Sequence, residues 1–360
     1  MRRLRVTSQS GNYDVLVGCG AWRGLRQFRG YSSRFILTER GLWNRWGKRF
    51  VREAGLRDAP PIFVPPGETS KSLKMVETVA SQLLEHGADR RSLLVAFGGG
   101  VIGDLGGFVA STYMRGIDYV QVPTTVVAQV DSAIGGKTAV NVRAMKNLVG
   151  TFYPPRQVLA DPTVLASLDE RAFHSGLHEV VKHAILAGPA FFRQLEAKIP
   201  SLHPNQGRAL EPILARAAQV KVEVVSRDER ESGLRRVLNL GHTFGHAFEE
   251  ATAYRRFLHG EAVGWGLLAV TSLAQLLGLL KPAEGEQIAR LVRRVGPLPP
   301  IGDLSPERIL ELLPRDKKAV AGQIHWVLPE RIGKVRIVKD APLGLAANAL
   351  REVQRGSRHE

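Results

Sequence analysis

Three histidines that lie close together in the sequence form the strongest candidate metal site. His242 and His246 are four residues apart, so in a helix both side chains leave the same face. A third, His259, begins the next apolar run and is followed by Gly260 and Glu261. Imidazole nitrogens gathered in this way are typical ligands of a divalent metal such as zinc. We therefore expect a metal centre in the second half of the chain.

The spacing of these residues leaves two ligand sets open. In the first, His242 and His246 both bind the metal in the i, i+4 manner. In the second, His242 and His259 bind together with Glu179 as an oxygen ligand, and His246 serves as a proton shuttle. Glu179 lies three residues before Lys182, a pair that in isolation would indicate a surface ion pair. Its combination with the three histidines favours a functional role.

A glycine-rich turn far upstream predicts a nucleotide site. The segment Gly98-Gly99-Gly100-Val101-Ile102-Gly103-Asp104 follows a predicted strand and begins a helical run. Read as Gly-x-Gly-x-x-Gly, it fits a dinucleotide fingerprint, in which absent side chains let the backbone approach a pyrophosphate. The turn does not belong to the first strand–helix unit, so we expect a variant of the Rossmann-like fold. A metal and a nucleotide in one enzyme indicate alcohol–ketone chemistry.

Polar residues also follow two other predicted strands. In residues 65–72, Glu68 is suited to accept ribose hydroxyls, while Thr69 or Ser70 caps the next helix. Capping alone would explain this segment equally well. Thr124 and Thr125 end another strand, at the sheet edge where open α/β sheets bind ligands.

Residues 131–138 resemble a P-loop only superficially. Asp131 stands where that motif has its first glycine, and no strand directly precedes the segment, so we exclude an NTPase. Instead, Gly135 and Gly136 would present Lys137 to an anion. The polar set continues with Asn141, Lys146 and Asn147.

The elements that must position these residues change in character midway along the chain. The first half alternates strand patterns with helical ones, with strands expected at 34–38, 61–64, 92–97 and 119–122 and a helix at 70–86. This alternation predicts a mostly parallel sheet covered by helices. Residues 1–17 would add an antiparallel hairpin that turns at Gly11-Asn12.

The second half reads as helical. We expect helices at 167–187, 209–225, 240–253, 261–280, 282–295 and 306–314, and one hairpin at 323–338. The expected division is therefore an α/β nucleotide-binding domain at 1–165 and a mainly α-helical metal and substrate domain at 166–360. The apolar stretch 262–280 contains Thr271, Ser272 and Gln275, which favours a buried core helix over a membrane span.

Composition narrows the class of protein. The chain has 360 residues, 44% of them hydrophobic and 23% charged, which is typical of a globular protein. Its net charge of +16 is spread along the chain without a nucleic-acid-binding signature, so neither nucleic acid nor membrane is an expected partner. The single Cys19 and the polar N-terminal residues, which lack a signal-peptide core, predict a cytoplasmic protein.

Taken together, the motifs resemble those of the 3-dehydroquinate synthase family. The resemblance runs through 98–107, 123–141, 146–153, 239–249, 259–263 and 316–318, in order and over nearly the whole chain. It implies an N-terminal NAD-binding α/β domain, a C-terminal α-helical metal-binding domain and a homodimer. It also implies a carbon–oxygen lyase of the shikimate pathway, which leads to chorismate and the aromatic amino acids. The substrate would be 3-deoxy-D-arabino-heptulosonate 7-phosphate, a phosphorylated sugar acid.

The resemblance also assigns roles to individual residues. It selects the second ligand set, so zinc or cobalt would be held by Glu179, His242 and His259. The implied NAD contacts are Glu68, Lys71, Gly100, Val101, Ile102, Gly103, Asp104, Thr124, Thr125, Lys137 and Lys146. The implied catalytic residues are Lys137, Lys182, Arg235, Asn239 and His246. The implied substrate contacts are Arg115, Asp131, Lys146, Asn147, Lys221 and Lys317.

Two related enzyme classes share parts of this pattern. Other sugar phosphate cyclases have the same metal and NAD motifs, but those whose substrate lacks a carboxylate need no residue like Arg235. A metal-dependent polyol dehydrogenase of the glycerol dehydrogenase type releases NADH and needs no lysine-rich shell. The joint presence of Arg235, Asn239, His246 and Asp316-Lys317-Lys318 therefore favours the dehydroquinate reaction.

Overall fold

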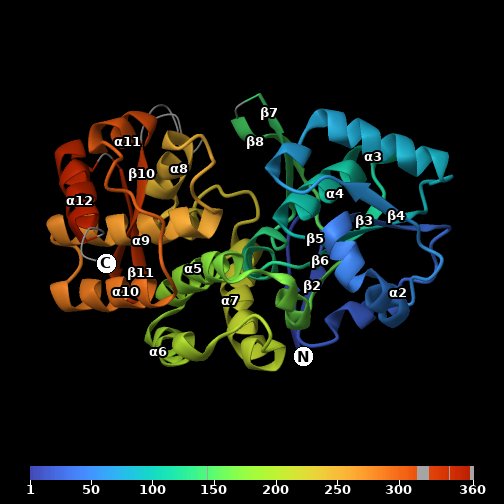
Figure 1. Ribbon diagram of the computed structural model, residues 1–360, viewed down its shortest axis with the longest axis horizontal. Coiled ribbons are helices and arrows are strands. Elements are labelled where there is room, and N and C mark those ends of the chain that lie inside the picture. Colours follow the sequence, from blue (N-terminus) through green and yellow to red (C-terminus); the bar gives the residue numbers. More distant parts are fainter. Residues whose placement is uncertain (144, 314–323, 340, 357–360) are drawn as a thin grey trace. The chain divides into compact units, whose positions relative to one another are not determined.

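A seven-stranded sheet forms the centre of the N-terminal part of the chain (Figure 1). Our computed structural model describes residues 1–143, 145–313, 324–339 and 341–356. Across the sheet the strands are β1 (Arg2–Val6), β2 (Tyr13–Val17), β9 (Gln157–Ala160), β6 (Asp118–Pro123), β5 (Leu93–Gly98), β3 (Arg34–Glu39) and β4 (Pro61–Val64). The hairpin β1–β2 is antiparallel, and the pairs from β2 to β4 across the sheet are parallel. The expected mostly parallel sheet is confirmed.

Alternate side chains of a strand belong to two different hydrophobic clusters, one on each side of the sheet. Leu94 and Ala96 of β5 lie in one cluster together with residues of α3 and α4. Val95 and Phe97 of the same strand lie in a second cluster with residues of η1 and α2. Because successive side chains of a strand point to opposite faces, a continuous apolar strand requires cover on both sides.

The remaining elements around the sheet are mostly helices. They are η1 (Ala21–Gln27), α1 (Arg40–Leu42), η2 (Trp43–Gly47), α2 (Lys48–Ala54), η3 (Glu68–Ser70), α3 (Leu73–Glu85), α4 (Gly100–Thr112), η4 (Tyr113–Arg115), η5 (Ala128–Ser132), η6 (Pro162–Ser167) and α7 (Gly207–Arg227). The hairpin of β7 (Lys137–Val142) and β8 (Met145–Phe152) forms a separate two-stranded sheet. Ser72, rather than Thr69 or Ser70, caps α3, because its side chain accepts from the Met75 N–H. A strand, not a helix, begins at Lys137, which agrees with excluding a P-loop.

A buried helix organises the C-terminal part. α9 (His259–Leu276) contacts α5 (Glu170–Ala187), α8 (His242–Ala251), α10 (Pro282–Arg294), α12 (Leu343–Gly356) and β10 (Figure 1). The other elements are α6 (Pro189–Lys198), η7 (Ile199–Ser201), η8 (Leu234–Asn239), α11 (Pro306–Leu312) and the antiparallel hairpin β10 (His325–Arg331) and β11 (Lys334–Lys339). The expected hairpin and core helix are thus confirmed. No helix among the described residues has the length and apolarity needed to cross a membrane.

The division of the chain differs from the expected boundary at 165–166 by three residues at that boundary and by one later segment. The first unit comprises Met1–Leu168 and His203–Arg230, and the second comprises Asp169–Leu202 and Glu231–Glu360. α7 therefore belongs with the sheet, although its sequence pattern resembles that of the later helices. It packs against β1 and η6, and its Glu211 binds both the N-terminal ammonium group at 2.5 Å and the Cys19 N–H at 3.0 Å.

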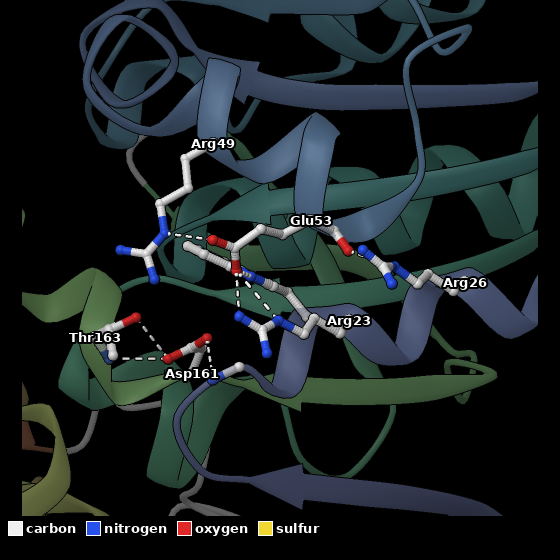
Figure 2. Close-up of polar contacts among 8 residues, drawn as sticks. Arg23, Arg26, Arg49, Glu53, Asp161 and Thr163 are labelled. Carbon is white, nitrogen blue, oxygen red and sulfur yellow. Dashed lines mark hydrogen bonds and ion pairs between the residues drawn. The ribbon is translucent and has the colours of Figure 1, made fainter.

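A cluster of charged residues joins η1 to α2 in the first unit (Figure 2). The Glu53 carboxylate accepts from Trp22 Nε1 at 3.1 Å, from Arg49 Nε at 2.9 Å and from the Arg23 guanidinium at 3.2 Å. Burial by itself would raise the pKa of Glu53, but these hydrogen bonds outweigh it and lower the pKa to about 2. The ionised carboxylate therefore stabilises the folded state.

Replacing Glu53 with Gln should lower the free energy of unfolding at pH 7 by about 2 kcal/mol, since bonds to an ionised acceptor are lost. The contribution of Glu53 is full above the ordinary pKa of 4.5 and disappears as the pH falls towards about 2. The loss measured by thermal or urea unfolding should therefore shrink between pH 5 and pH 2. The exposed Glu77→Gln serves as the control, and a deficit that does not depend on pH would contradict this assignment.

Candidate functional site

Two histidine nitrogens and one carboxylate oxygen converge in the second unit. Glu179 lies on the buried helix α5, while His242 and His259 are the first residues of α8 and α9. The Nε2 atoms of His242 and His259 lie 3.5 and 3.3 Å from the same Glu179 oxygen, Oε1. Glu179 is 0% exposed, so this arrangement holds a carboxylate deep inside the protein.

The other ring nitrogen of each histidine faces a different acceptor. Nδ1 of His242 lies 3.3 Å from the Leu240 carbonyl oxygen, and Nδ1 of His259 lies 3.4 Å from Glu249 Oε2. Acceptors of this kind fix the ring orientation of metal-binding histidines and leave Nε2 free to coordinate. Sequence reasoning missed Glu249, although it follows His242 by seven residues and therefore shares its helix face.

The electrostatics of this cluster favour a cation. Burial alone would lower the pKa of His259, but the carboxylates of Glu179 and Glu249 outweigh burial and raise it to about 10. Two carboxylates thus stabilise positive charge at one imidazole. A divalent cation among these donors would compensate the same buried negative charge.

The donor separations also fit a tetrahedral ion. Bonds of about 2.0–2.1 Å from nitrogen and oxygen to zinc place neighbouring ligands roughly 3.4 Å apart. The observed separations of 3.5 and 3.3 Å are close to that value. Glu179, His242 and His259 are therefore suited to hold zinc or cobalt, with a fourth position left for substrate.

His246 lies beside this set. Its ring centroid is 5.5 Å from that of His242 and 6.2 Å from that of His259. Together with Glu249 and His259 it forms a second group of donor atoms close enough for a metal. Neither donor group found among the described residues combines His242 with His246. The geometry thus favours the ligand set with Glu179 over the i, i+4 histidine pair.

Lys182 pairs with the metal-site carboxylate of Glu179. The Lys182 ammonium lies 2.5 Å from Glu179 Oε2, and both side chains are 0% exposed, so this is a buried pair rather than a surface one. Arg235 and Asn239 both come from η8, and Arg235 is 2% exposed. Asn239 Nδ2 donates to Glu231 Oε1 at 2.7 Å. Glu231 was not among the expected residues, and its sequence carries no signal for this contact.

Two glycines allow α9 to approach its neighbours closely enough to position His259. A Cβ atom at Gly260 would overlap the Ser175 carbonyl oxygen of α5, and one at Gly264 would overlap the His178 ring. The Gly260 N–H also donates to Ser175 Oγ at 3.1 Å. These contacts determine the distance between the helices that carry Glu179 and His259.

Gly260→Ala should therefore separate α9 from α5. We expect a loss of about 2–3 kcal/mol in the free energy of unfolding and a clear loss of metal affinity, because His259 directly precedes the altered residue. Unfolding curves and metal titrations would measure both effects. Gly344→Ala on α12 is the matched control, because a Cβ there meets no neighbouring atom. Unchanged metal affinity in Gly260→Ala would disprove the positioning role.

The glycine-rich turn of the first unit lies at the carboxyl end of β5. α4 begins at Gly100, and the Thr124 N–H donates to the Gly98 carbonyl at 2.9 Å, which joins this turn to the end of β6. A Cβ at Gly103 would overlap Gln121. The Ile102 side chain is buried in the core, so that residue can contact a ligand only through its backbone. Thr125 Oγ1 accepts from the Ala128 N–H at 3.2 Å.

A buried ion pair lies next to this turn. Lys71 Nζ contacts Asp104 Oδ2 at 2.7 Å and Asn147 Oδ1 at 2.5 Å, and Lys71 is 4% exposed. Burial would lower the pKa of Lys71, but Asp104 and Glu68 outweigh burial and raise it. The structure therefore brings together four expected site residues: Glu68, Lys71, Asp104 and Asn147.

Other expected residues of the first unit lie around the β7–β8 hairpin and α7. Lys221 of α7 forms an ion pair with Asp131 of η5. Lys137 is the first residue of β7 and is exposed, and Lys146 on β8 is half-buried. Lys317 lies outside the described residues.

Arg115 stands apart from the rest of this set. It ends η4, just before β6, whereas Thr124 and Thr125 follow the far end of the same strand. A six-residue strand is roughly 20 Å long. Arg115 therefore lies at the opposite edge of the sheet from the glycine-rich turn.

Models of two protein domains match the chain. The 3-dehydroquinate synthase N-terminal domain matches residues 61–175, and the 3-dehydroquinate synthase C-terminal domain matches residues 176–319. The chain belongs to the 3-dehydroquinate synthase family. A 3-dehydroquinate synthase of Pelotomaculum thermopropionicum is 50% identical over 98% of this chain and 96% of its own length. One of Koribacter versatilis is 41% identical over 98% of both chains.

Solved structures of related cyclases share the fold of this 3-dehydroquinate synthase family member. A 2-epi-5-epi-valiolone synthase from Streptomyces hygroscopicus, with NAD+ and Zn2+ bound, is 30% identical with a TM-score of 0.87, covering 98% of this chain and 100% of the other. A 2-deoxy-scyllo-inosose synthase in complex with carbaglucose-6-phosphate, NAD+ and Co2+ is 25% identical with a TM-score of 0.85, covering 98% and 99%. A probable glycerol dehydrogenase from Sinorhizobium meliloti, 18% identical with a TM-score of 0.65 over 96% and 97%, shares the fold alone.

Proposed function

We propose that this protein is a 3-dehydroquinate synthase, which converts 3-deoxy-D-arabino-heptulosonate 7-phosphate to 3-dehydroquinate and phosphate. The reaction combines oxidation of a hydroxyl, elimination of phosphate, reduction and intramolecular aldol closure, and it consumes no cofactor. Its overall class is that of a carbon–oxygen lyase acting on phosphates. The observation that carries the proposal is the convergence of Glu179, His242 and His259 in a chain of this family.

The ligand set implies two bound groups. When bound, a divalent cation such as Zn2+ or Co2+ would supply Lewis acidity, and NAD+ would accept and return the hydride. Glu179, His242 and His259 would hold the cation through one oxygen and two Nε2 atoms. Support comes from the related cyclases, whose structures contain NAD+ with Zn2+ and NAD+ with Co2+.

Further residues of the second unit would bind and protonate the substrate. Arg235 offers a rigid, bidentate donor for the substrate carboxylate, and its burial would strengthen that contact. His246 and Asn239 would relay protons to and from substrate hydroxyls. Lys182 would place a buried positive charge beside the reacting oxygens, balanced by Glu179.

Residues of the first unit would bind the nucleotide and the phosphorylated end of the substrate. Gly100 to Asp104 would offer backbone N–H groups at the start of α4 to the pyrophosphate, where the helix dipole favours an anion. Glu68, Lys71, Thr124 and Thr125 would complete the nucleotide contacts. The substrate and its leaving phosphate would be held by Lys137, Lys146, Asn147, Asp131, Lys221 and Lys317.

We also propose a homodimer, in which Arg115 of one copy serves the site of the other. Arg115 lies roughly 20 Å from the sheet edge where the nucleotide would bind, a gap set by the length of β6 and beyond the reach of its side chain. This separation supports a substrate contact by Arg115 from a second copy. Sedimentation or mass photometry would test the dimer, and mixing Arg115→Ala with Glu179→Gln subunits should restore part of the activity that each variant lacks.

A coupled assay tests the proposed reaction directly. Purified protein with NAD+, Zn2+ and 3-deoxy-D-arabino-heptulosonate 7-phosphate should release phosphate and dehydroquinate in equal amounts without net NADH. Turnover of a heptulose phosphate that lacks the carboxylate, and not of this substrate, would instead indicate another sugar phosphate cyclase. NADH accumulation with a simple polyol and no phosphate release would indicate a polyol dehydrogenase.

A further inference from the structure

Asn141 occupies an irregular position in the β7–β8 hairpin. The pairing register of the hairpin shifts between Val140 and Val142, where Asn141 alone on β7 lies opposite residues 146–148 of β8, so the extra residues of the bulge are on β8. Its backbone N–H donates instead to the Lys71 carbonyl at 2.8 Å, and Ser72 forms an isolated bridge with Asn141. At this irregular position the backbone of Asn141 thus pairs with the loop before α3 rather than with β8.

Both the nitrogen and the oxygen of the Asn141 side-chain amide form hydrogen bonds. Nδ2 donates to Glu68 Oε1 at 2.8 Å and to the Glu68 carbonyl at 3.4 Å. Oδ1 accepts from the backbone N–H of Asn147 at 2.8 Å. One half-buried side chain therefore connects a proposed nucleotide contact, Glu68, with a proposed substrate contact, Asn147.

The bond to Asn147 stabilises an unusual backbone conformation. Asn147 has φ of 53°, in the left-handed region that residues other than glycine rarely adopt. In this conformation its side chain reaches Lys71 Nζ at 2.5 Å, and Lys71 in turn pairs with Asp104 on α4. The conformation of residue 147 consequently affects the charged groups beside the glycine-rich turn.

We propose that Asn141 is a positioning residue for the reaction: it fixes the backbone at Asn147 and the carboxylate of Glu68 through the two ends of one amide. This inference rests on the proposed function, since it assumes that Glu68 binds NAD+ and Asn147 binds substrate. The amide is required because it combines a donor with an acceptor. An aspartate would keep the acceptor for Asn147 but present a second carboxylate to Glu68.

Hydrogen–deuterium exchange of the full-length protein without ligands tests the structural part. Asn141→Ala should speed exchange at the Asn147 amide by roughly 3- to 10-fold, as expected for the loss of one hydrogen bond. The isosteric Asn141→Asp should leave that amide protected, while exposed Asn44→Ala is the control. Unchanged exchange in Asn141→Ala would overturn the proposal whether or not the protein is a dehydroquinate synthase.

The pH dependence of NAD+ binding tests the link to Glu68. In Asn141→Asp, two carboxylates face each other near Lys71 and, beyond it, Asp104. At pH 8 their repulsion should weaken NAD+ binding roughly ten-fold relative to the native protein, and a shared proton should restore it near pH 5.5. Asn44→Asp controls for added charge. A ratio of affinities that stays constant with pH would overturn the proposal, whereas a native protein that binds no NAD+ would instead disprove the proposed function.

Discussion

Glu179→Gln and His259→Ala are each expected to lose the bound metal and to lower turnover at least about a thousand-fold, because Lewis acidity at the substrate hydroxyl disappears. Each change removes one of the three donors proposed to hold the cation. Metal content by atomic emission and the coupled phosphate assay measure the two effects. Circular dichroism should show a retained fold, with Glu179→Gln less stable, since Lys182 loses its buried carboxylate partner.

Matched variants separate this effect from general damage. Glu250→Gln changes the residue next to Glu249 on α8, and His203→Ala removes an exposed histidine of the first unit. Both should keep native metal content and turnover. If Glu179→Gln and His259→Ala also retained native metal content and turnover, the ligand assignment would be wrong.

Arg235→Met is expected to raise KM for 3-deoxy-D-arabino-heptulosonate 7-phosphate roughly 100- to 1,000-fold, with a smaller change in kcat. Removing one partner of a buried, charge-assisted contact leaves the substrate carboxylate desolvated and without its donor. Arg235→Lys should recover only part of the loss, because an ammonium cannot form the same two parallel bonds. Steady-state kinetics with the native protein and both variants measure this.

The control for Arg235 is its neighbour. Arg236→Met lies on the same short helix η8 and is less buried than Arg235, so it should leave KM near the native value. A heptulose 7-phosphate without the carboxylate provides a second comparison, because the native preference against it should vanish in Arg235→Met. An unchanged preference for the substrate with the carboxylate would show that Arg235 does not recognise that group.

The sequence was most informative where local pattern encodes local structure. Continuous apolar runs predicted the parallel strands, because a strand covered on both faces has no polar side. The N-terminal hairpin, the hairpin after α11 and the buried α9 followed from the same reasoning. It did not predict the β7–β8 hairpin, in which most side chains of β8 are exposed, or that α7 packs with the sheet.

For the candidate site, the sequence by itself determined the residue types and the motifs that indicate this family. The residues His242 and His259 were recognisable because they begin successive helical segments and stand beside glycines. Glu179 belonged to one of two open ligand sets, and only the resemblance selected that set, since nothing in its local pattern links α5 to α8 and α9. Glu249 and Glu231 were outside the expected site altogether, and Asn141 was expected only as a member of the polar set after Lys137, without a role of its own.

The tertiary structure decided which of these groups meet. The spacing of apolar residues along a helix or strand shows which of its faces is buried, but it does not show which other element covers that face. The contact of Glu179 with both histidines depends on the close approach of α5 and α9, which Gly260 and Gly264 permit. The roles proposed for Asn141 and Arg115 depend likewise on the irregular pairing of the β7–β8 hairpin and on the length of β6. Such distances arise from packing between elements, and so the sequence of any one element does not contain them.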